Sequence, residues 1–391
     1  MLHKAMQIKN ELVAWRRDIH AHPELGFEET RTAALVAEAL QKMGWNVRTG
    51  VGRTGVVGEK STRPTEGPIV ALRADMDALQ IQEMNEVAYK SCNPSVMHAC
   101  GHDTHTAMLL GAAHLLAQED FPGTIRLLFQ PSEERGDIEG ISGALRMIQD
   151  GAMDGVEMVF AQHVDPSTPV GMIRVSPGPC SGGVDSFFGT IIGKGGHGAR
   201  PHESIDPFYL SAFVILAING IFSRRIDPFD PNVVSIGSMH AGQASNVIPD
   251  ILEISGTIRY TEKRVQKKLH AEIRQAFELV RPLGGDYKLN FEIGLPPMVN
   301  HSDAVDIIQA AAEGIIGKAN VQPLEKELGA EDFGLLSNHS PGAMFVLGTK
   351  IENDLRFGHN PRFDIDENAL PIGTAIMAQT ALEYLRHKTK A

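Results

Sequence analysis

The sequence is poor in cysteine, with three among 391 residues. Such an odd and sparse count excludes a disulfide framework and is typical of a reducing compartment, where a thiol stays available as a ligand. Residues 1–10 lack the apolar core and the small-residue cleavage site of a signal peptide. We therefore expect a cytoplasmic protein. The cysteines are Cys92, Cys100 and Cys180.

Long hydrophobic runs and excess positive charge are also missing. The longest apolar stretch, around 208–221, is interrupted by Ser211 and Asn219, so it falls short of a membrane-spanning helix. Lys and Arg number 36 against 48 Asp and Glu, which gives a net charge of −12. Because an acidic protein is repelled by nucleic acid and by anionic membranes, we expect neither as a partner.

The length favours two domains, because one hydrophobic core rarely serves 391 residues. In residues 1–182 and 297–391, short apolar strands alternate with helices. This pattern predicts an α/β domain, in which helices flank a sheet on both faces.

The middle of the chain, 183–296, has a different rhythm. Its apolar pattern predicts the order βαββαβ, which is the split βαβ arrangement of ferredoxin-like domains. We therefore expect an inserted ferredoxin-like α+β domain within the larger one. The expected strands are 185–193, 232–242, 248–260 and 287–295, and the expected helices are 208–225 and 262–283.

Residues 97–105 (MHACGHDTH) hold the densest group of metal-binding side chains: a thiol, three imidazoles and a carboxylate. Residues i and i+2 do not share a face of a helix. If Cys100 and His102 serve one site, they should lie on a loop or strand end, followed by a helix with Asp103 or Thr104 as its N-cap. Alternatively, Cys100 is a buried core thiol.

Polar side chains follow several expected strands. Asp75 and Asp77 end one strand, Glu133-Glu134 follow another, and His163 follows a third. Open α/β sheets bind ligands beyond the carboxyl ends of their strands. We expect these side chains to converge near Cys100 and His102.

Five residues are candidate metal ligands. Thiolate, imidazole and carboxylate together suit zinc, and also admit manganese, cobalt or nickel. Five exceed the needs of one tetrahedral site, whereas two divalent ions about 3.5–4 Å apart would use them all. The candidates are Cys100, His102, Glu134, His163 and His359.

In the Glu133-Glu134 pair, one carboxylate could bind metal while its neighbour acts as a general base on water. The rival interpretation is a cysteine hydrolase with Cys100 as nucleophile and His163 as base.

A glycine-rich segment, 193–202, surrounds His197. It lacks the Gly-Lys-Ser/Thr ending of a phosphate-binding loop. Close backbone approach at the glycines would let His197 stabilise a tetrahedral oxyanion. Asn246 and Arg259 could hold an amide or a carboxylate, although Arg259 could equally form a surface salt bridge.

Five motifs together resemble the M20 metallopeptidases, and more narrowly their subfamily D, the aminoacylase and hippurate-hydrolase-like branch of N-acyl-amino-acid amidohydrolases. Relatives commonly have proline where this chain has Gln80. The motifs are RADMDAL (73–79), MHACGHD (97–103), QPSEE (130–134), GGHGA (195–199) and NVIPD (246–250).

The resemblance implies a zinc-peptidase-like catalytic domain with an inserted lid or dimerisation domain, and a homodimer or homotetramer formed through that lid. It implies a dinuclear centre on the five candidate ligands, with Cys100 as bridge and Glu133 as general base. It assigns His197 to the scissile carbonyl, in its own or a partner's site.

The implied activity is hydrolysis of N-acyl-L-amino acids to a carboxylic acid and an amino acid. The alternatives are an M20-type dipeptidase or carboxypeptidase, the cysteine hydrolase, and a non-catalytic metal-binding homologue. Benzoyl, acetyl, indole-acetyl and longer acyl groups all remain open.

Overall fold

A computed structural model describes residues 1–62, 67–354 and 356–388. It divides into two compact units. The first comprises Met1–Gly178, Val299–Glu325 and Asp332–Ala391, and the second comprises Pro179–Met298 and Lys326–Glu331. The second unit is thus inserted in the sequence of the first, and the short segment Lys326–Glu331 joins it from farther along the chain.

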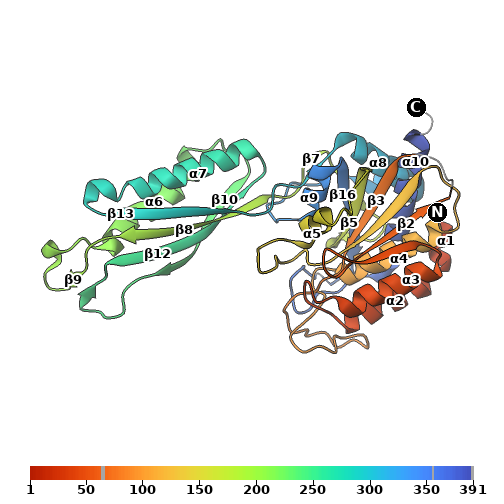
Figure 1. Cartoon of the computed structure of the whole chain (residues 1–391), viewed down its shortest axis with the longest axis horizontal. Coiled ribbons are helices and arrows are strands. Elements are labelled where there is room, and N and C mark those ends of the chain that lie inside the picture. The colour runs from red at the N-terminus through yellow and green to blue at the C-terminus, as the bar shows by residue number, and fades with distance from the viewer. Residues whose placement is uncertain (63–66, 355, 389–391) are drawn as a thin grey trace. The chain divides into compact units, whose positions relative to one another are not determined.

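The first unit contains an eight-stranded mixed sheet of order β1-β2-β4-β3-β5-β16-β6-β15 (Figure 1). Its central strands β4, β3, β5 and β16 are parallel to one another. The pairs β1-β2, β2-β4 and β6-β16 are antiparallel, and the edge strand β15 pairs in parallel with β6. Parallel neighbours place their carboxyl ends at one edge of the sheet. The strands are β1 Asn46–Val51, β2 Gly55–Ser61, β3 Ile69–Asp75, β4 Thr124–Gln130, β5 Val156–Pro169, β6 Ile173–Arg174, β15 Val321–Gln322 and β16 Gly342–Lys350, with the short pair β7 Gly178–Pro179 and β14 Val299–Asn300.

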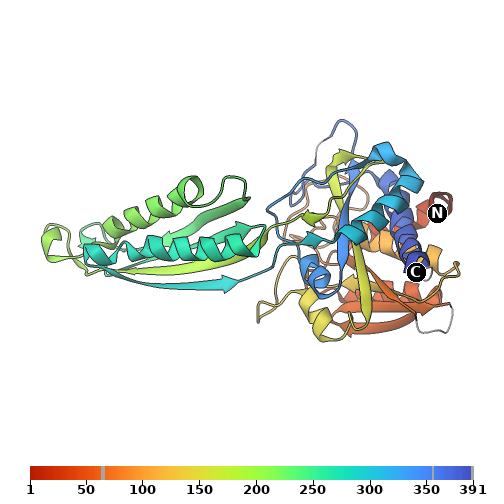
Figure 2. The same ribbon diagram turned by 90° about the horizontal axis from the view of Figure 1, so that it is seen from above.

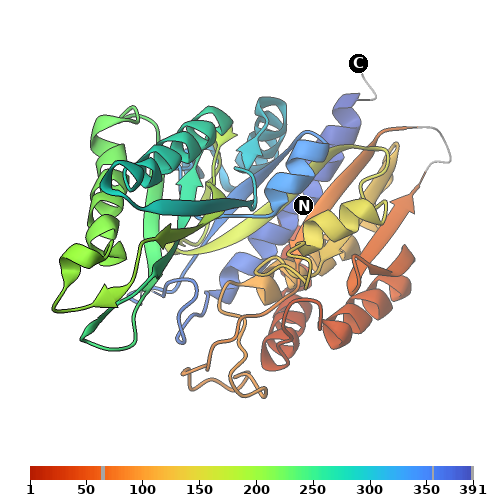
Figure 3. The same cartoon turned by 60° about the vertical axis from the view of Figure 1, so that its left-hand side comes forward.

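Helices flank this sheet (Figure 3). α4 and α10 pack on β3 and on each other. α4 is apolar on nearly all sides, as expected of a helix covered by its neighbours. The helices are α1 Leu2–Gln7, α2 Lys9–Ala21, α3 Thr30–Lys42, α4 His102–Leu116, α5 Gly143–Gln149, α8 Ser302–Ile316, η3 Lys318–Asn320, α9 Phe333–His339, η4 Glu367–Ala369 and α10 Leu370–Lys388.

The second unit contains an antiparallel four-stranded sheet of order β10-β12-β8-β13. Its helices α6 and α7 contact each other and lie along the sheet (Figure 2). Numbered in chain order, the strands β13, β8, β12 and β10 are arranged 4-1-3-2 across the sheet, which is the ferredoxin-like arrangement. The elements are β8 Gly183–Ile192, β9 Gly196–His197, η1 Pro201–Glu203, α6 Pro207–Arg224, β10 Asn232–His240, β11 Val247–Ile248, β12 Ile251–Tyr260, α7 Lys263–Glu278, η2 Arg281–Leu283 and β13 Asp286–Ile293.

By length and composition alone, α6 could cross a membrane, with a mean hydropathy of 1.4 and 33% of its residues buried. It packs against α7 and the strands β8, β10 and β12. One side of α6 therefore belongs to the core of the second unit, and the other side is exposed and apolar.

The helix after Cys100 begins earlier than predicted, because its N-cap is Gly101 and not Asp103 or Thr104, and the prediction that His102 lies outside the helix is wrong. Its first residue is His102, and Gly101 precedes it with φ 94. Glycine adopts this left-handed backbone without strain. A side chain at Gly101 would also meet Val164 Cγ2 at 2.3 Å. Cys100 thus lies on the loop and His102 on the helix.

A buried ionic network ties α2 to the start of α4. The guanidinium of Arg16 is 0% exposed and donates to Asp103 Oδ2 at 2.9 Å and to Asp364 Oδ1 at 2.7 Å. His20 Nδ1 lies 2.8 Å from the same Asp103 oxygen. Burial lowers the pKa of Arg16, but the two carboxylates outweigh it and raise that pKa overall. The network therefore holds Asp103, the residue after His102, in place at the start of α4.

The second unit has its own buried carboxylate, Asp185 on β8. It accepts hydrogen bonds from His270 Nε2 at 2.7 Å, Gln266 Nε2 at 2.8 Å and Gly294 N–H at 3.2 Å. Burial raises the pKa of Asp185, but these donors lower it more, so the net shift is downward. The carboxylate joins the start of β8, the end of β13 and α7.

The Arg16 network predicts a large loss of stability in Arg16→Met. Removing the cation leaves Asp103 and Asp364 buried without their ion-pair partner, which should lower the free energy of unfolding by about 3–5 kcal/mol. Urea denaturation measures this. The matched control is Arg17→Met, because Arg17 is 46% exposed and should contribute less than about 1 kcal/mol. Equal losses in both variants would contradict the network's role.

Asp185 predicts a pH-dependent stability of the second unit. Because its folded pKa lies below the unfolded value of about 3.9, its contribution is present above that pH and is lost as pH falls through the folded pKa. Asp185→Asn should destabilise the unit by about 1–3 kcal/mol at pH 7. The difference in stability between the wild type and Asp185→Asn should shrink below about pH 4. Hydrogen exchange of peptides from β8 and α7 measures it; a gap that is constant with pH would disprove the prediction.

Candidate metal centre

The structure brings all five predicted ligands to one edge of the sheet in the first unit. Their ligating atoms form two triads that share Cys100, and within each triad they lie within 4.8 Å of one another. Two triads that share one thiol would suit a pair of neighbouring ions with that thiol between them. The triads are Cys100, His102 and His163, and Cys100, Glu134 and His359.

The imidazoles of His102 and His163 are oriented by oxygen atoms that lie next to their Nδ1 atoms. His163 Nδ1 lies 2.8 Å from the Val164 carbonyl, and its Nε2 lies 3.5 Å from Cys100 Sγ. His102 Nδ1 lies 3.1 Å from Asp77 Oδ1, while its buried Nε2 has no hydrogen-bond partner in the described structure. A metal-binding histidine typically donates its outer N–H to a carbonyl or carboxylate in this way. Both rings therefore fit a ligand role.

The electrostatics of the site favour positive charge. Burial raises the pKa of the Cys100 thiol, so a thiolate at this depth needs a neighbouring cation. Burial lowers the pKa of His102, but Asp75 outweighs it and raises that pKa well above its usual value. A divalent ion would supply the positive charge that these groups attract, and the mixed sulfur, nitrogen and oxygen donors suit zinc or a neighbouring transition metal.

His359 lies on the loop after β16 in a strained conformation. Its φ is 57, and its N–H donates to the Ala99 carbonyl at 2.7 Å. Its Nε2 lies 3.2 Å from Glu134 Oε1, and its side chain is 57% exposed. Positive φ is uncommon outside glycine and often marks functional sites. The backbone bond holds His359 next to the Cys100 loop.

Glu133 lies beside the candidate ligands. One oxygen of Glu133 lies within 4.8 Å of ligating atoms of His102 and Glu134. Glu133 Oε1 accepts a hydrogen bond from the Asp332 N–H at 3.4 Å. The Glu134 N–H donates to Asp77 Oδ2 at 3.0 Å. The turn thus points one carboxylate into a triad and keeps the other within reach of the same space.

His105 is not among the five predicted ligands, but it is fully buried behind the site. Its Nδ1 lies 2.6 Å from Asp75 Oδ1, and its Nε2 accepts the Val164 N–H at 3.0 Å. With both nitrogens engaged, His105 is a positioning group between β3 and β5. Its spacing of three residues from His102 on one helix was an available signal.

A second buried network was also missed. Arg73 donates to Asp75 Oδ2 at 2.7 Å and to Asp332 Oδ1 at 2.9 Å. It connects the carboxylate behind His102 with the residue that contacts Glu133. The segment before α9 showed no pattern that would have singled out Asp332.

The predicted substrate-binding residues all lie in the second unit. β9 pairs with β11, so that His197 faces Val247, and the Gly198 N–H donates to the Asn246 carbonyl at 2.8 Å. The Ala199 N–H donates to His197 Nδ1 at 3.0 Å, which leaves Nε2 as the N–H donor of an exposed imidazole. The motifs around His197 and Asn246 therefore form one structure.

Arg259 is not part of that structure. It pairs with Val184 at the start of β8, whereas the His197 segment follows Ile192 at the other end. Eight residues of strand separate these positions by roughly 26 Å.

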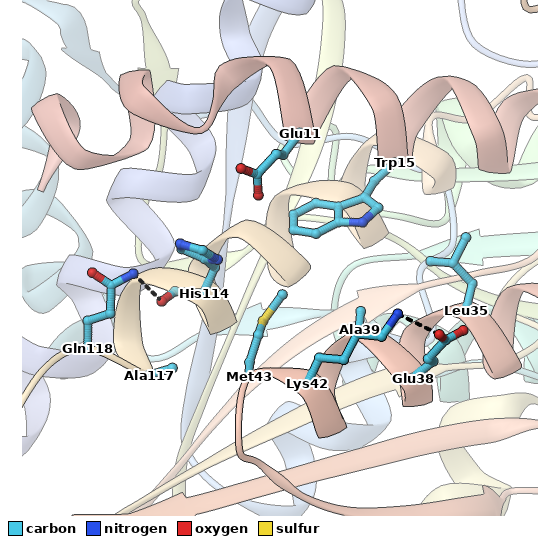
Figure 4. Close-up of a pocket in the computed structure, with 10 residues that line it drawn as sticks. All are labelled: Glu11, Trp15, Leu35, Glu38, Ala39, Lys42, Met43, His114, Ala117 and Gln118. Atoms are coloured by element: carbon cyan, nitrogen blue, oxygen red, sulfur yellow. Dashed lines mark hydrogen bonds and ion pairs between the residues drawn. The ribbon is translucent and has the colours of Figure 1, made fainter.

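A groove of about 570 Å³ lies between α2, α3 and α4 (Figure 4). Trp15, Leu35 and Met43 line its apolar part, and the ion pair between Glu38 and Lys42 lies at its margin. It contains none of the predicted site residues.

The fold and the site define a class: a hydrolase with an α/β catalytic domain that acts on amide bonds with a dinuclear metal centre. Residues 71–383 match the model of peptidase family M20/M25/M40. The chain belongs to this family, and it fits the amidohydrolase branch.

Named relatives agree with this assignment. Thermostable carboxypeptidase 2 of Saccharolobus solfataricus is 41% identical, over 97% of this chain and 96% of its own. IAA-amino acid hydrolase ILR1-like 4 of Arabidopsis thaliana is 38% identical, over 96% and 87%. The YXEP protein of Bacillus subtilis, described as a dinuclear metal-binding peptidase, superposes with a TM-score of 0.85 at 32% identity, over 97% and 99%.

Proposed function

We propose that this protein hydrolyses the amide bond of N-acyl-L-amino acids. The observation that carries the proposal is the pair of triads sharing Cys100, with Glu133 within reach of them. A relative named as an IAA-amino acid hydrolase supports an acyl-amino-acid substrate. The cytoplasmic location expected from the sparse cysteines is part of the proposal.

Two bound divalent ions, zinc, manganese, cobalt or nickel, would lower the pKa of a water and polarise the substrate carbonyl. Glu133 takes the proton from the attacking water and passes it to the leaving nitrogen. His197 donates its Nε2–H to the carbonyl oxygen as negative charge develops there. Asn246 binds the substrate beside His197, and Arg259 is the weaker proposal because it lies at the other end of β8. The residues that would hold the ions are Cys100, His102, Glu134, His163 and His359.

A carboxypeptidase activity is the second candidate, because a 41% identical relative carries that name. Both substrate classes present an amide next to a free carboxylate. A panel of acetyl, benzoyl and indole-acetyl amino acids set against dipeptides separates them. Faster turnover of dipeptides would favour the second candidate.

The base assignment predicts that Glu133→Gln lowers kcat by roughly 10²–10⁴-fold while metal content stays unchanged, because the amide cannot accept the proton. Steady-state kinetics and metal analysis measure both. Glu139→Gln is the matched control, since Glu139 lies nearby in the sequence with a 62% exposed side chain. Chelation should abolish turnover, whereas a Cys100 nucleophile would not need metal. A Glu133→Gln enzyme with normal kcat would overturn the assignment.

We also propose that the second unit forms a homodimer contact, from which a homotetramer could be built. Tyr209, Phe213 and Leu216 form an apolar stripe on α6, with exposures of 57%, 36% and 71%. β10 is an edge strand of the sheet, and α6 packs beside it. Exposed apolar patches and edge strands both favour association.

The contact predicts that Leu216→Glu converts the oligomer to monomer, because a charge is then buried in the interface without a partner. Light scattering after size exclusion measures the mass. Leu283→Glu is the control, since Leu283 is a 39% exposed leucine of the same unit outside α6. An unchanged oligomer in Leu216→Glu would locate the interface elsewhere, and a wild-type monomer would remove the proposal.

A further inference from the structure

We propose that Glu29 is a positioning residue that holds the turn 131–135 in the conformation that presents Glu133 and Glu134. The inference deepens the proposed function, because it rests on the roles given there to these two carboxylates. It also assigns a role to the segment before α3, which belongs neither to the candidate metal centre nor to the motifs around His197 and Asn246.

The turn is held in an unfavourable backbone conformation. Ser132, directly before Glu133, has φ 44 and is fully buried. A non-glycine residue in this region carries strain that the surroundings must offset. All the polar groups of Ser132 are engaged. Its N–H donates to Glu29 Oε1 at 2.8 Å, its carbonyl accepts from Gly143 N–H at 2.9 Å, and its Oγ donates to the Arg135 carbonyl at 2.8 Å.

The Glu29 carboxyl group is itself costly to bury. It is 0% exposed, and its second oxygen accepts from the Thr54 hydroxyl. In the described part of the chain no lysine or arginine pairs with it, and burial raises the pKa of Glu29 to about 7. A buried carboxyl group held by two neutral donors is poor for stability. The position of the Glu29 carboxyl group is explained by the hydrogen bond that it accepts from the backbone N–H of the strained residue Ser132.

Gly26 closes on the same turn from the same segment. A Cβ at Gly26 would meet Ser132 Oγ at 2.2 Å and Ser132 Cβ at 2.9 Å. The Arg135 Nε donates to the Gly26 carbonyl at 3.1 Å. Residues 26–29 therefore contact both ends of the turn, through packing at Gly26 and through the hydrogen bond at Glu29.

The test compares two substitutions of Glu29 by titrating metal-free full-length protein with Mn²⁺ in a calorimeter. Glu29→Leu removes the acceptor and should weaken Mn²⁺ binding about 10–100-fold, because Glu134 is no longer held. Glu29→Gln keeps an acceptor for Ser132 and a partner for Thr54, so its Kd should stay within about threefold of wild type. A kcat that follows the same order supports positioning, whereas a folded Glu29→Leu variant with wild-type Kd overturns it.

Glu24→Gln is the matched control. Glu24 lies in the same segment, but its carboxylate accepts the Arg31 and Thr32 N–H groups at 2.8 Å each and caps α3. This variant should lower Tm and leave the Kd for Mn²⁺ unchanged. A Kd that rises in Glu24→Gln as much as in Glu29→Leu would show a general loss of structure and overturn the specific role.

A second pair of variants decides the question if Glu29→Leu does not fold. Gly26→Ala pushes against Ser132 and should weaken Mn²⁺ binding. Adding Ser132→Gly removes Oγ and Cβ, the two atoms that the new methyl group meets most closely, and glycine adopts φ 44 freely. The double variant should recover at least part of the lost affinity. Wild-type affinity in Gly26→Ala, or no recovery in the double variant, overturns the proposal.

These outcomes are separate from the proposed function. The Kd for Mn²⁺ does not depend on which amide is the substrate. Absence of turnover on every N-acyl amino acid would reject the proposed function and leave the Glu29 test intact. Conversely, a Glu29→Leu variant with wild-type affinity would reject the positioning role and leave the hydrolase standing.

Discussion

The first unit depends on how it compensates negative charge that it buries at one edge of its sheet. Asp75, Asp77 and Asp103 are each at most 1% exposed. Arg16 and Arg73, equally buried, neutralise Asp103 and Asp75 from behind. On the opposite side, Cys100 and Glu134 turn toward the space between the triads. Burying these groups is favourable only with cations nearby, so the same charge that shapes the fold makes the site attract metal ions.

Two strained backbone positions lie at the same edge. Ser132 and His359 have positive φ without being glycine; Ser132 directly precedes the candidate base Glu133, and His359 is a candidate ligand. Such conformations persist only where the surroundings determine them. Here two hydrogen bonds hold the strained residues. The Ser132 N–H donates to the Glu29 carboxyl group, and the His359 N–H donates to the Ala99 carbonyl. The candidate ligand His359 and the candidate base Glu133 are thus placed by contacts from segments far away in the sequence.

Much of this could be predicted from the sequence, because strand periodicity and the polar residues after each strand carry the information. The α/β class is confirmed, and Asp75, Asp77, Glu134 and His163 do converge on Cys100 and His102. The order βαββαβ gave the strand pattern of the second unit. Other features depend on packing that no local pattern encodes. In the sequence His105 resembles a surface histidine, and only the fold shows that it contacts Asp75 and Val164. Arg259 was a candidate site residue, but the strand register places it far from His197.

The spread of the candidate ligands along the chain would link metal binding to folding. Cys100 precedes α4, Glu134 follows β4, His163 lies in β5, and His359 follows β16. An unfolded chain cannot hold these groups together, so ions bind the folded state far better and stabilise it by mass action. An ion bound by Cys100 would also displace the thiol proton, whose pKa burial raises, so the affinity would fall as pH falls. Arg16, Arg73 and His105 lessen the opposing cost, because they fix the surrounding residues before any ion arrives. The buried networks therefore stabilise the core and also preorganise the candidate metal centre.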